Sequence, residues 1–196
     1  TTPPGDEAAR RRALCAVVDR VALRARAREL VLVDGRSGAG KSSLADDLRD
    51  LLDATGRAVA LVRMDDVYPG WTGLAAAASE VSTRLVRPFL STGVGCHGTW
   101  DWQQSTPGSP RTTPPGADLL LLEGCGSSSH VRDLDPVVVW LEAPEATRLQ
   151  RAIDRDGPEY ARWARVWSAQ EVDTVARRQL VPLDVASHPR TGTASP

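Results

Sequence analysis

Apolar residues along the chain fall into two kinds of pattern. Four short continuous apolar runs are typical of strands buried on both faces of a parallel sheet. They lie at Leu30–Val33, Ala58–Val62, Leu119–Leu122 and Val137–Leu141. Between them, apolar positions recur every three or four residues, which predicts helices. The expected helices cover residues 1–28, 41–54, 74–90, 145–155 and 159–180. Because strands that alternate with helices need crossover connections, we expect one mainly parallel sheet with helices on both faces.

The remaining segments have weaker patterns. Residues 93–100 are weakly strand-like, and residues 103–117 are expected to be a loop because they are rich in Pro, Ser, Thr and Gly. The first helix is expected to start at a cap formed by Asp6, and the tail at residues 188–196 to be disordered. A length of 196 residues suits one domain, with its core at residues 30–185.

One motif points to chemistry. Residues 35–42 read Gly-Arg-Ser-Gly-Ala-Gly-Lys-Ser and match G-x-x-x-x-G-K-[ST], directly after an apolar run and before a helix. Such a loop wraps backbone N–H groups around a phosphate, while Lys41 supplies charge and the Ser42 hydroxyl ligates Mg²⁺. We therefore expect a P-loop NTPase fold, a three-layer α/β/α sandwich, that binds ATP and Mg²⁺. The candidate nucleotide-binding residues here are Gly35, Ser37, Gly38, Ala39, Gly40, Lys41, Ser42 and Ser43.

Acidic residues follow two of the expected strands. Asp65 and Asp66 come after the second apolar run, and Glu123 ends the third. The carboxyl ends of parallel strands meet where ligands bind, so these acids should converge on the phosphates. Asp65 is the candidate base that takes the proton of an attacking hydroxyl. Asp66 competes for that role or caps the next turn. Glu123 binds Mg²⁺ or substrate hydroxyls, or else makes a structural hydrogen bond; the candidate metal ligands are Ser42, Asp65 and Glu123.

An ordered series of segments carries a family resemblance. After the phosphate loop come Asp65-Asp66-Val67-Tyr68, Trp100-Asp101-Trp102, Glu123-Gly124, Val131-Arg132-Asp133-Leu134, Thr147-Arg148-Leu149-Gln150-Arg151 and Arg155-Asp156. In this order they resemble the uridine kinase family, within the wider P-loop nucleoside and pantothenate kinase group. The resemblance spans residues 30–185 and is more specific than the phosphate loop alone.

The resemblance implies roles for individual residues. It assigns the catalytic carboxylate to Asp65 and places Tyr68 and Trp100 near a nucleoside. It also implies a short lid helix on which Arg148, Arg151 and Arg155 close over the triphosphate, with Arg151 catalytic. Guanidinium groups can stabilise the transferred phosphoryl group, although a solvated amphipathic helix would show the same spacing. The candidate acceptor-binding residues are Asp66, Tyr68, Trp71, Trp100, Asp101, Trp102 and Glu123.

Two segments depart from the family pattern. Gln103-Gln104-Ser105 stands where the family has a His-containing segment for pyrimidine recognition, and residues 69–73 replace an acidic stretch that binds sugar hydroxyls. The chain also resembles a group of uridine kinase-like bacterial proteins with an Asp-Asp-x-Tyr-Pro-Gly-Trp segment. We expect a kinase for a nucleoside-like hydroxyl compound. The alternatives are an antibiotic-inactivating phosphotransferase on the same scaffold and a non-catalytic nucleotide-binding module.

Composition limits the partners and the location. A net charge of −1 gives no reason to expect nucleic acid or an anionic membrane as a partner. No apolar run approaches the length of a membrane span, and Cys15, Cys96 and Cys125 lack the spacing of a zinc site or a disulfide framework. We expect a cytoplasmic protein that binds a small-molecule acceptor, with a homodimer left open. The absence of an Asn-Lys-x-Asp motif argues against a GTPase switch, while GTP stays open as the donor.

Overall fold

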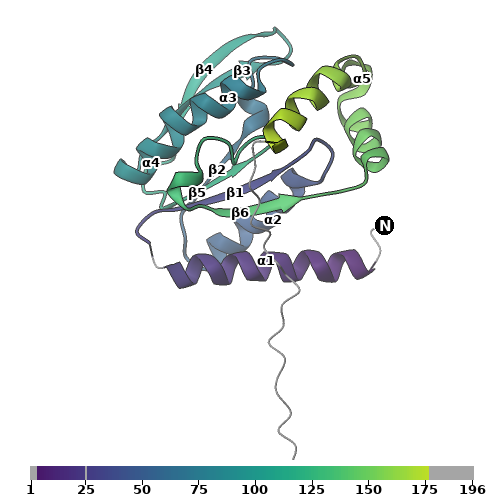
Figure 1. Cartoon of the computed structure of the whole chain (residues 1–196). Helices are drawn as coiled ribbons and strands as arrows, with labels where there is room; N and C mark the ends of the chain where they lie inside the picture. The colour runs from purple at the N-terminus through teal and green to yellow at the C-terminus, as the bar shows by residue number, and fades with distance from the viewer. Residues whose placement is uncertain (1–3, 25, 177–196) are drawn as a thin grey trace, which may run out of the picture.

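The computed structural model describes residues 4–24 and 26–176 (Figure 1). Its centre is a parallel sheet with the strand order β2-β5-β1-β6. The four strands are β1 (Glu29–Gly35), β2 (Val59–Arg63), β5 (Leu119–Glu123) and β6 (Val137–Leu141). Both central strands, β1 and β5, are buried along their whole length. The four apolar runs thus correctly predicted strands, of which the two central ones are buried throughout and the edge strands β2 and β6 are partly exposed.

Helices cover both faces of the sheet and complete three layers (Figure 1). One face packs against α1 (Pro4–Arg24) and α2 (Lys41–Ala54), and the other packs against α3 (Leu74–Glu80) and α5 (Glu145–Ala176). Alternate strand residues divide between the two cores, as the pleat requires: Val31 faces α1 and α2, whereas Leu32 faces the opposite layer. The expected three-layer fold with a mainly parallel sheet is confirmed. None of the helices within the described ranges is long and apolar enough to cross a bilayer.

The ends of α1 differ from the prediction. The helix begins at Pro4, so Asp6 lies inside it and does not cap it, and residues 26–28 are not helical. The tail of residues 188–196 and the predicted helix end at residue 180 lie outside the described residues.

The predicted helix at residues 74–90 is divided. A π-helical turn, Val81–Val86, separates α3 from α4 (Arg87–Thr92). Pro88 lies in the first turn of α4, directly after the π turn. The π turn carries Ser82, whose hydroxyl donates to the carbonyl of His130 at 2.8 Å. The widened turn is therefore anchored to the loop that follows β5.

The expectation of a loop at residues 103–117 was wrong. Residues Thr106–Thr112 form a strand, β4, that pairs antiparallel with β3 (Cys96–Asp101) as a separate hairpin. This strand has a partner on one side only and is largely exposed. Pro107 and Pro110 are tolerated because a proline on an edge strand needs no ladder donor on its open side. The loop-like composition of this segment therefore concealed an edge strand.

Helix α5 contains a sharp break. Gly157 has φ 68° and ψ −153°, outside helical values, and Pro158 follows it. The segments before and after this break match the two helices predicted at residues 145–155 and from residue 159. The break turns the chain back towards the sheet, so both halves of α5 contact the phosphate loop, as described below.

Candidate nucleotide and acceptor site

The phosphate loop lies between the end of β1 and the start of α2. Gly40 has φ 96° and precedes the first residue of α2, so the helix N-terminus opens directly onto the loop. Gly38 has φ 76°, and a Cβ atom built there would lie 2.1 Å from the carbonyl oxygen of Arg148. Only glycine therefore fits at position 38, because both the backbone conformation and the close approach of α5 exclude a side chain.

Lys41 is the buried cation of this loop. It is 8% exposed, and its Nζ donates to the carbonyl of Arg36 at 3.1 Å and lies 3.4 Å from the Cys125 sulfur. Burial alone would lower the pKa of Lys41, but the surrounding acidic groups, including Asp65 and Glu123, raise it above 10.5. The ammonium group therefore stays charged at neutral pH, as phosphate binding requires. Burial also raises the pKa of Cys125 to about 12, so this thiol is not ionised.

Ser42 and Glu123 form the candidate metal position. The Ser42 hydroxyl donates to Glu123 Oε1 at 3.2 Å, and Arg63 Nη1 lies 3.3 Å from the same oxygen. Glu123 is 1% exposed, and desolvation, with a contribution from Asp65, raises its pKa. Within the described ranges, no group of three His, Cys, Asp or Glu side chains could hold a metal. A hydroxyl beside one carboxylate nevertheless fits Mg²⁺, which usually takes few protein oxygens and completes its shell with phosphates and water.

We predict that Glu123→Gln removes part of the pH dependence of stability in the nucleotide-free protein. Because the pKa of Glu123 is raised above 4.5 in the folded state, the folded protein binds this proton more tightly than the unfolded chain. Stability therefore falls as the pH rises through the range from 4.5 to the folded pKa. The amide still accepts from Ser42 but has no charge to bury. Thermal unfolding across this range should show a shallower decline for the variant, and identical declines would contradict the assignment.

Asp65 faces the same cavity from the end of β2. It lies in the 3-10 turn Met64–Asp66, is exposed, and lines the cavity with Lys41, Ser42 and Glu123. The indole N–H of Trp102 donates to the backbone carbonyl of Asp65 at 2.8 Å, which ties the turn to the β3–β4 hairpin. The carboxylate itself is left facing the cavity beside the phosphate loop. This position is consistent with the expected base.

An aromatic wall lines the other side of this cavity. Trp71 lies at its centre, with ring centroids 5.1 Å from Trp102 and 6.0 Å from both Tyr160 and Trp167. Tyr68 joins it through Trp167 at 4.8 Å and donates its hydroxyl to the Cys125 carbonyl at 2.8 Å. The cavity has a volume of about 630 Å³. Phosphate-binding groups, a carboxylate and an aromatic surface therefore meet in one space.

Most of the predicted site residues meet in this cavity. The ones that line it are Ser37, Lys41, Ser42, Asp65, Asp66, Tyr68, Trp71, Trp102, Glu123 and Arg155. Five others belong to the loop and the first turn of α2 but do not line the cavity: Gly35, Gly38, Ala39, Gly40 and Ser43. Asp66 also pairs with Arg111 of β4 at 3.3 Å. Arg155 is paired with Asp156 at 2.6 Å, and this hydrogen bond raises the pKa of the guanidinium.

Four predicted residues lie elsewhere. Trp100 is paired with Pro107 in the β3–β4 hairpin, and the Asp101 carboxylate accepts the N–H groups of the hairpin turn. Arg148 is buried and donates to the carbonyls of Ala143 and Ser37, so its guanidinium holds backbone behind the loop. Arg151 is exposed and lines none of the described cavities. The three lid arginines thus face three different surroundings in this structure.

Several residues of the site were not predicted. Asp34 is fully buried at the end of β1 and accepts hydrogen bonds from Gly35, Gly126 and Ser128, which orders the loop after β5. An acid at the end of an apolar run, directly before the phosphate loop, was an available signal. Other unpredicted residues that line the cavity are Gln103, Cys125, Asp156, Glu159, Tyr160 and Trp167. The last two are seven residues apart in one helix, a spacing that places them on the same face.

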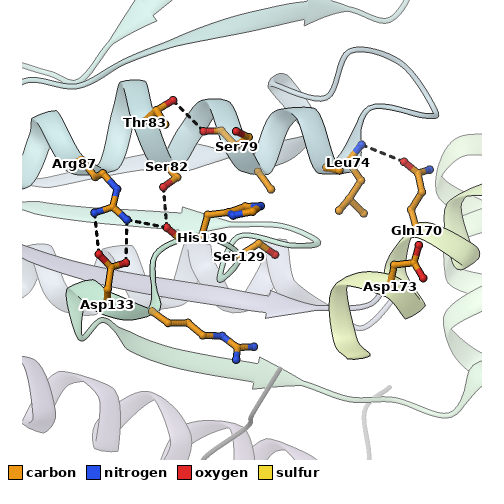
Figure 2. A pocket seen from close by; sticks show the side chains of 13 residues that line it. Leu74, Ser79, Ser82, Thr83, Arg87, Ser129, His130, Asp133, Gln170 and Asp173 are labelled. Atoms are coloured by element: carbon orange, nitrogen blue, oxygen red, sulfur yellow. Dashed lines mark hydrogen bonds and ion pairs between the residues drawn. The ribbon is translucent and has the colours of Figure 1, made fainter. Parts of the chain in front are cut away.

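A second cavity, of about 680 Å³, lies between α3, the π turn and the loop after β5 (Figure 2). Its floor is ordered by Arg87, which forms two hydrogen bonds with Asp133 and donates to the His130 carbonyl. None of the predicted site residues lines it. The phosphate-binding chemistry therefore belongs to the first cavity.

Comparisons with known proteins agree with the fold. No protein-family model matches the chain, and no curated protein matches it. Among solved structures, a "possible uridine kinase" from Bacillus stearothermophilus is 21% identical, with a TM-score of 0.56 over 86% of this chain and 98% of that one. A "putative fructose transport system kinase" from Silicibacter is 20% identical, with a TM-score of 0.56 over 83% of this chain and 90% of that one. The chain thus has the fold of P-loop kinases.

Proposed function

We propose that this protein is a kinase that transfers the γ-phosphoryl group of ATP, with Mg²⁺, to a hydroxyl of a small molecule. The observation that carries the proposal is the shared cavity, where Asp65 faces Lys41, Ser42 and Glu123. A nucleotide-binding module would need the phosphate loop but no carboxylate at that place. The kinase-like fold of the solved structures supports the same class of reaction without identifying the acceptor.

The reaction follows from the placement of these groups. The phosphate loop and Lys41 hold the phosphates, and Ser42 and Glu123 would hold Mg²⁺, which neutralises charge on the phosphoryl oxygens when bound. The Asp65 carboxylate accepts the proton of the acceptor hydroxyl while its oxygen attacks the γ-phosphorus. The bond between the γ-phosphorus and the bridging oxygen then breaks, and ADP leaves. The chain thus contributes positioning and charge, and Asp65 moves the proton.

The aromatic wall supports a nucleoside or a nucleoside-like compound as the acceptor. A nucleobase stacked on an aromatic side chain gains about 1–3 kcal/mol. An antibiotic with a planar ring and a hydroxyl would use the same surface. The experiment below distinguishes a nucleoside acceptor from an antibiotic acceptor.

Acceptor-stimulated release of ADP tests the proposal. The protein is incubated with ATP and Mg²⁺, alone and with each member of a panel of nucleosides, nucleoside antibiotics and simple sugars. We expect at least one compound with a planar ring to raise the rate of ADP release well above the rate that the protein shows with ATP and Mg²⁺ alone. Tight nucleotide binding without any stimulation across the panel would favour a binding module instead.

A further inference from the structure

The peptide of Ser37 in the phosphate loop is held at both ends by α5. Its N–H donates to Glu171 Oε1 at 2.6 Å, and its carbonyl accepts from Arg148 Nη1 at 3.3 Å. These two side chains come from opposite sides of the break at Gly157. Ser37 lines the nucleotide cavity and immediately precedes Gly38. A shift of its peptide would therefore change the shape of the phosphate cradle.

Glu171 is a buried carboxylate with a complete set of donors. It is 3% exposed and accepts from Ser37 N–H and, at 3.1 Å, from the Trp167 indole N–H through Oε1. Its Oε2 pairs with Arg36 Nε at 3.2 Å. A carboxylate so deeply buried would be strongly unfavourable without such partners. The Cys125 thiol also donates to Oε1 at 3.4 Å, so donors from the loop, from α5 and from the segment after β5 give the carboxylate one defined place.

The turn that carries Glu171 is itself fixed. The neighbouring Gln170 donates from its Nε2 to the Trp71 carbonyl at 2.8 Å and accepts from the Leu74 N–H at 3.3 Å. Trp167, one turn earlier, packs against Tyr68 and Trp71. Glu171 is thus anchored on a turn that cannot shift without disturbing the aromatic wall.

Glu171 does not occupy the place of a phosphate. It lines a separate cavity of about 340 Å³ with Arg36 and Arg148, behind the loop, whereas Lys41 and Ser42 line the cavity in front. A carboxylate in front would compete with the nucleotide. From behind, it can orient the loop without contacting the ligand.

We propose that Glu171 is a positioning residue for nucleotide binding: from α5 it fixes the Ser37 peptide and so sets the geometry of the phosphate loop. This inference rests on the proposed nucleotide-binding function. The carboxylate acts through the backbone of Ser37 and touches neither substrate. Its removal should therefore weaken nucleotide binding in a protein that is still folded.

Equilibrium binding of fluorescently labelled MgADP to the full chain tests this role. Glu171→Ala should weaken binding by about tenfold or more, the effect of losing one charge-assisted hydrogen bond. Glu171→Gln should lose less, because its amide oxygen can still accept from Ser37. Glu145→Gln is the matched control, since Glu145 lines the same cavity on the same helix without a hydrogen bond to the loop, and it should bind like wild type.

The outcomes separate this inference from the proposed function. Wild-type affinity in Glu171→Ala, with a lowered unfolding temperature only, would overturn the positioning role and leave the kinase proposal intact. If Glu171→Ala does not fold, Glu171→Gln decides: a partial loss of affinity in the folded variant supports the positioning role, because the ion pair with Arg36 is gone, and wild-type affinity overturns it. If wild type itself binds no MgADP, both proposals fail.

Discussion

Asp65→Asn is expected to reduce phosphoryl transfer by roughly 10²–10⁴-fold, the usual contribution of a general base. Asparagine has nearly the same shape but cannot take the proton of the attacking hydroxyl. The turn should persist because Trp102 is bonded to the backbone carbonyl of Asp65, which the substitution keeps. Single-turnover measurement of phosphorylated acceptor gives the rate of the chemical step, and MgADP affinity should stay within about threefold of wild type.

Asp66→Asn is the matched control for this prediction. Asp66 lines the same cavity one residue later, but it pairs with Arg111 of β4 in an exposed ion pair at 3.3 Å. Loss of an exposed pair costs at most about 1 kcal/mol of stability, and Asp65 rather than Asp66 takes the proton in this account, so the effect on the rate should be small. If Asp66→Asn greatly reduced the rate of phosphoryl transfer and Asp65→Asn had little effect, Asp66 rather than Asp65 would be the general base.

Gly38→Ala is expected to disable the phosphate loop. The new Cβ would lie 2.1 Å from the carbonyl oxygen and 2.7 Å from the Cα of Arg148, both fixed backbone atoms of α5. Neither contact can be relieved by rotating a side chain, so the loop or the helix must move. A displacement of about 1 Å can cost roughly 100-fold in rate. MgADP binding and acceptor phosphorylation should both fall, and thermal unfolding should occur at a lower temperature.

Gly116→Ala is the control that distinguishes the steric clash of the new Cβ at position 38 from the backbone strain of a left-handed alanine. Gly116 has φ 80°, close to the 76° of Gly38, but a Cβ atom added there would have no neighbouring atom within 4 Å. It lies between β4 and β5, away from the nucleotide cavity, and should lose only the roughly 1–2 kcal/mol of a left-handed alanine. Normal nucleotide binding is expected. If Gly38→Ala were as mild as Gly116→Ala, the close packing of α5 on the loop would be refuted.

The parts of the site that sequence could predict are those with short-range signals. The phosphate loop has a fixed spacing, and Asp65 and Glu123 follow apolar runs whose ends must align in a parallel sheet. These signals need no knowledge of how distant segments pack. The sheet, the two covering layers and the break in α5 followed from the same local patterns.

The predicted residues that lie outside the cavity are those whose surroundings depend on tertiary contacts. Arg148, Arg151 and Arg155 have helical spacing that suits a lid, but Arg148 points back to the Ser37 carbonyl once α5 packs on the loop. Asp101 lies in a segment that resembles a substrate-binding motif. Its carboxylate instead accepts from the hairpin turn, and that turn exists only because the Pro-rich strand β4 pairs with β3. Glu171 lies 134 residues from Ser37 in sequence, and no local pattern indicates that contact.

The most direct test of the kinase account is the mass of the acceptor after incubation with ATP and Mg²⁺. Wild-type protein, Asp65→Asn and Asp66→Asn are each incubated with the panel of nucleosides and nucleoside antibiotics, and the products are measured by mass spectrometry. The account predicts a compound heavier by one phosphoryl group, formed by wild type and Asp66→Asn and strongly reduced with Asp65→Asn. An acceptor phosphorylated equally by all three proteins, or ATP bound with no acceptor modified, would contradict it.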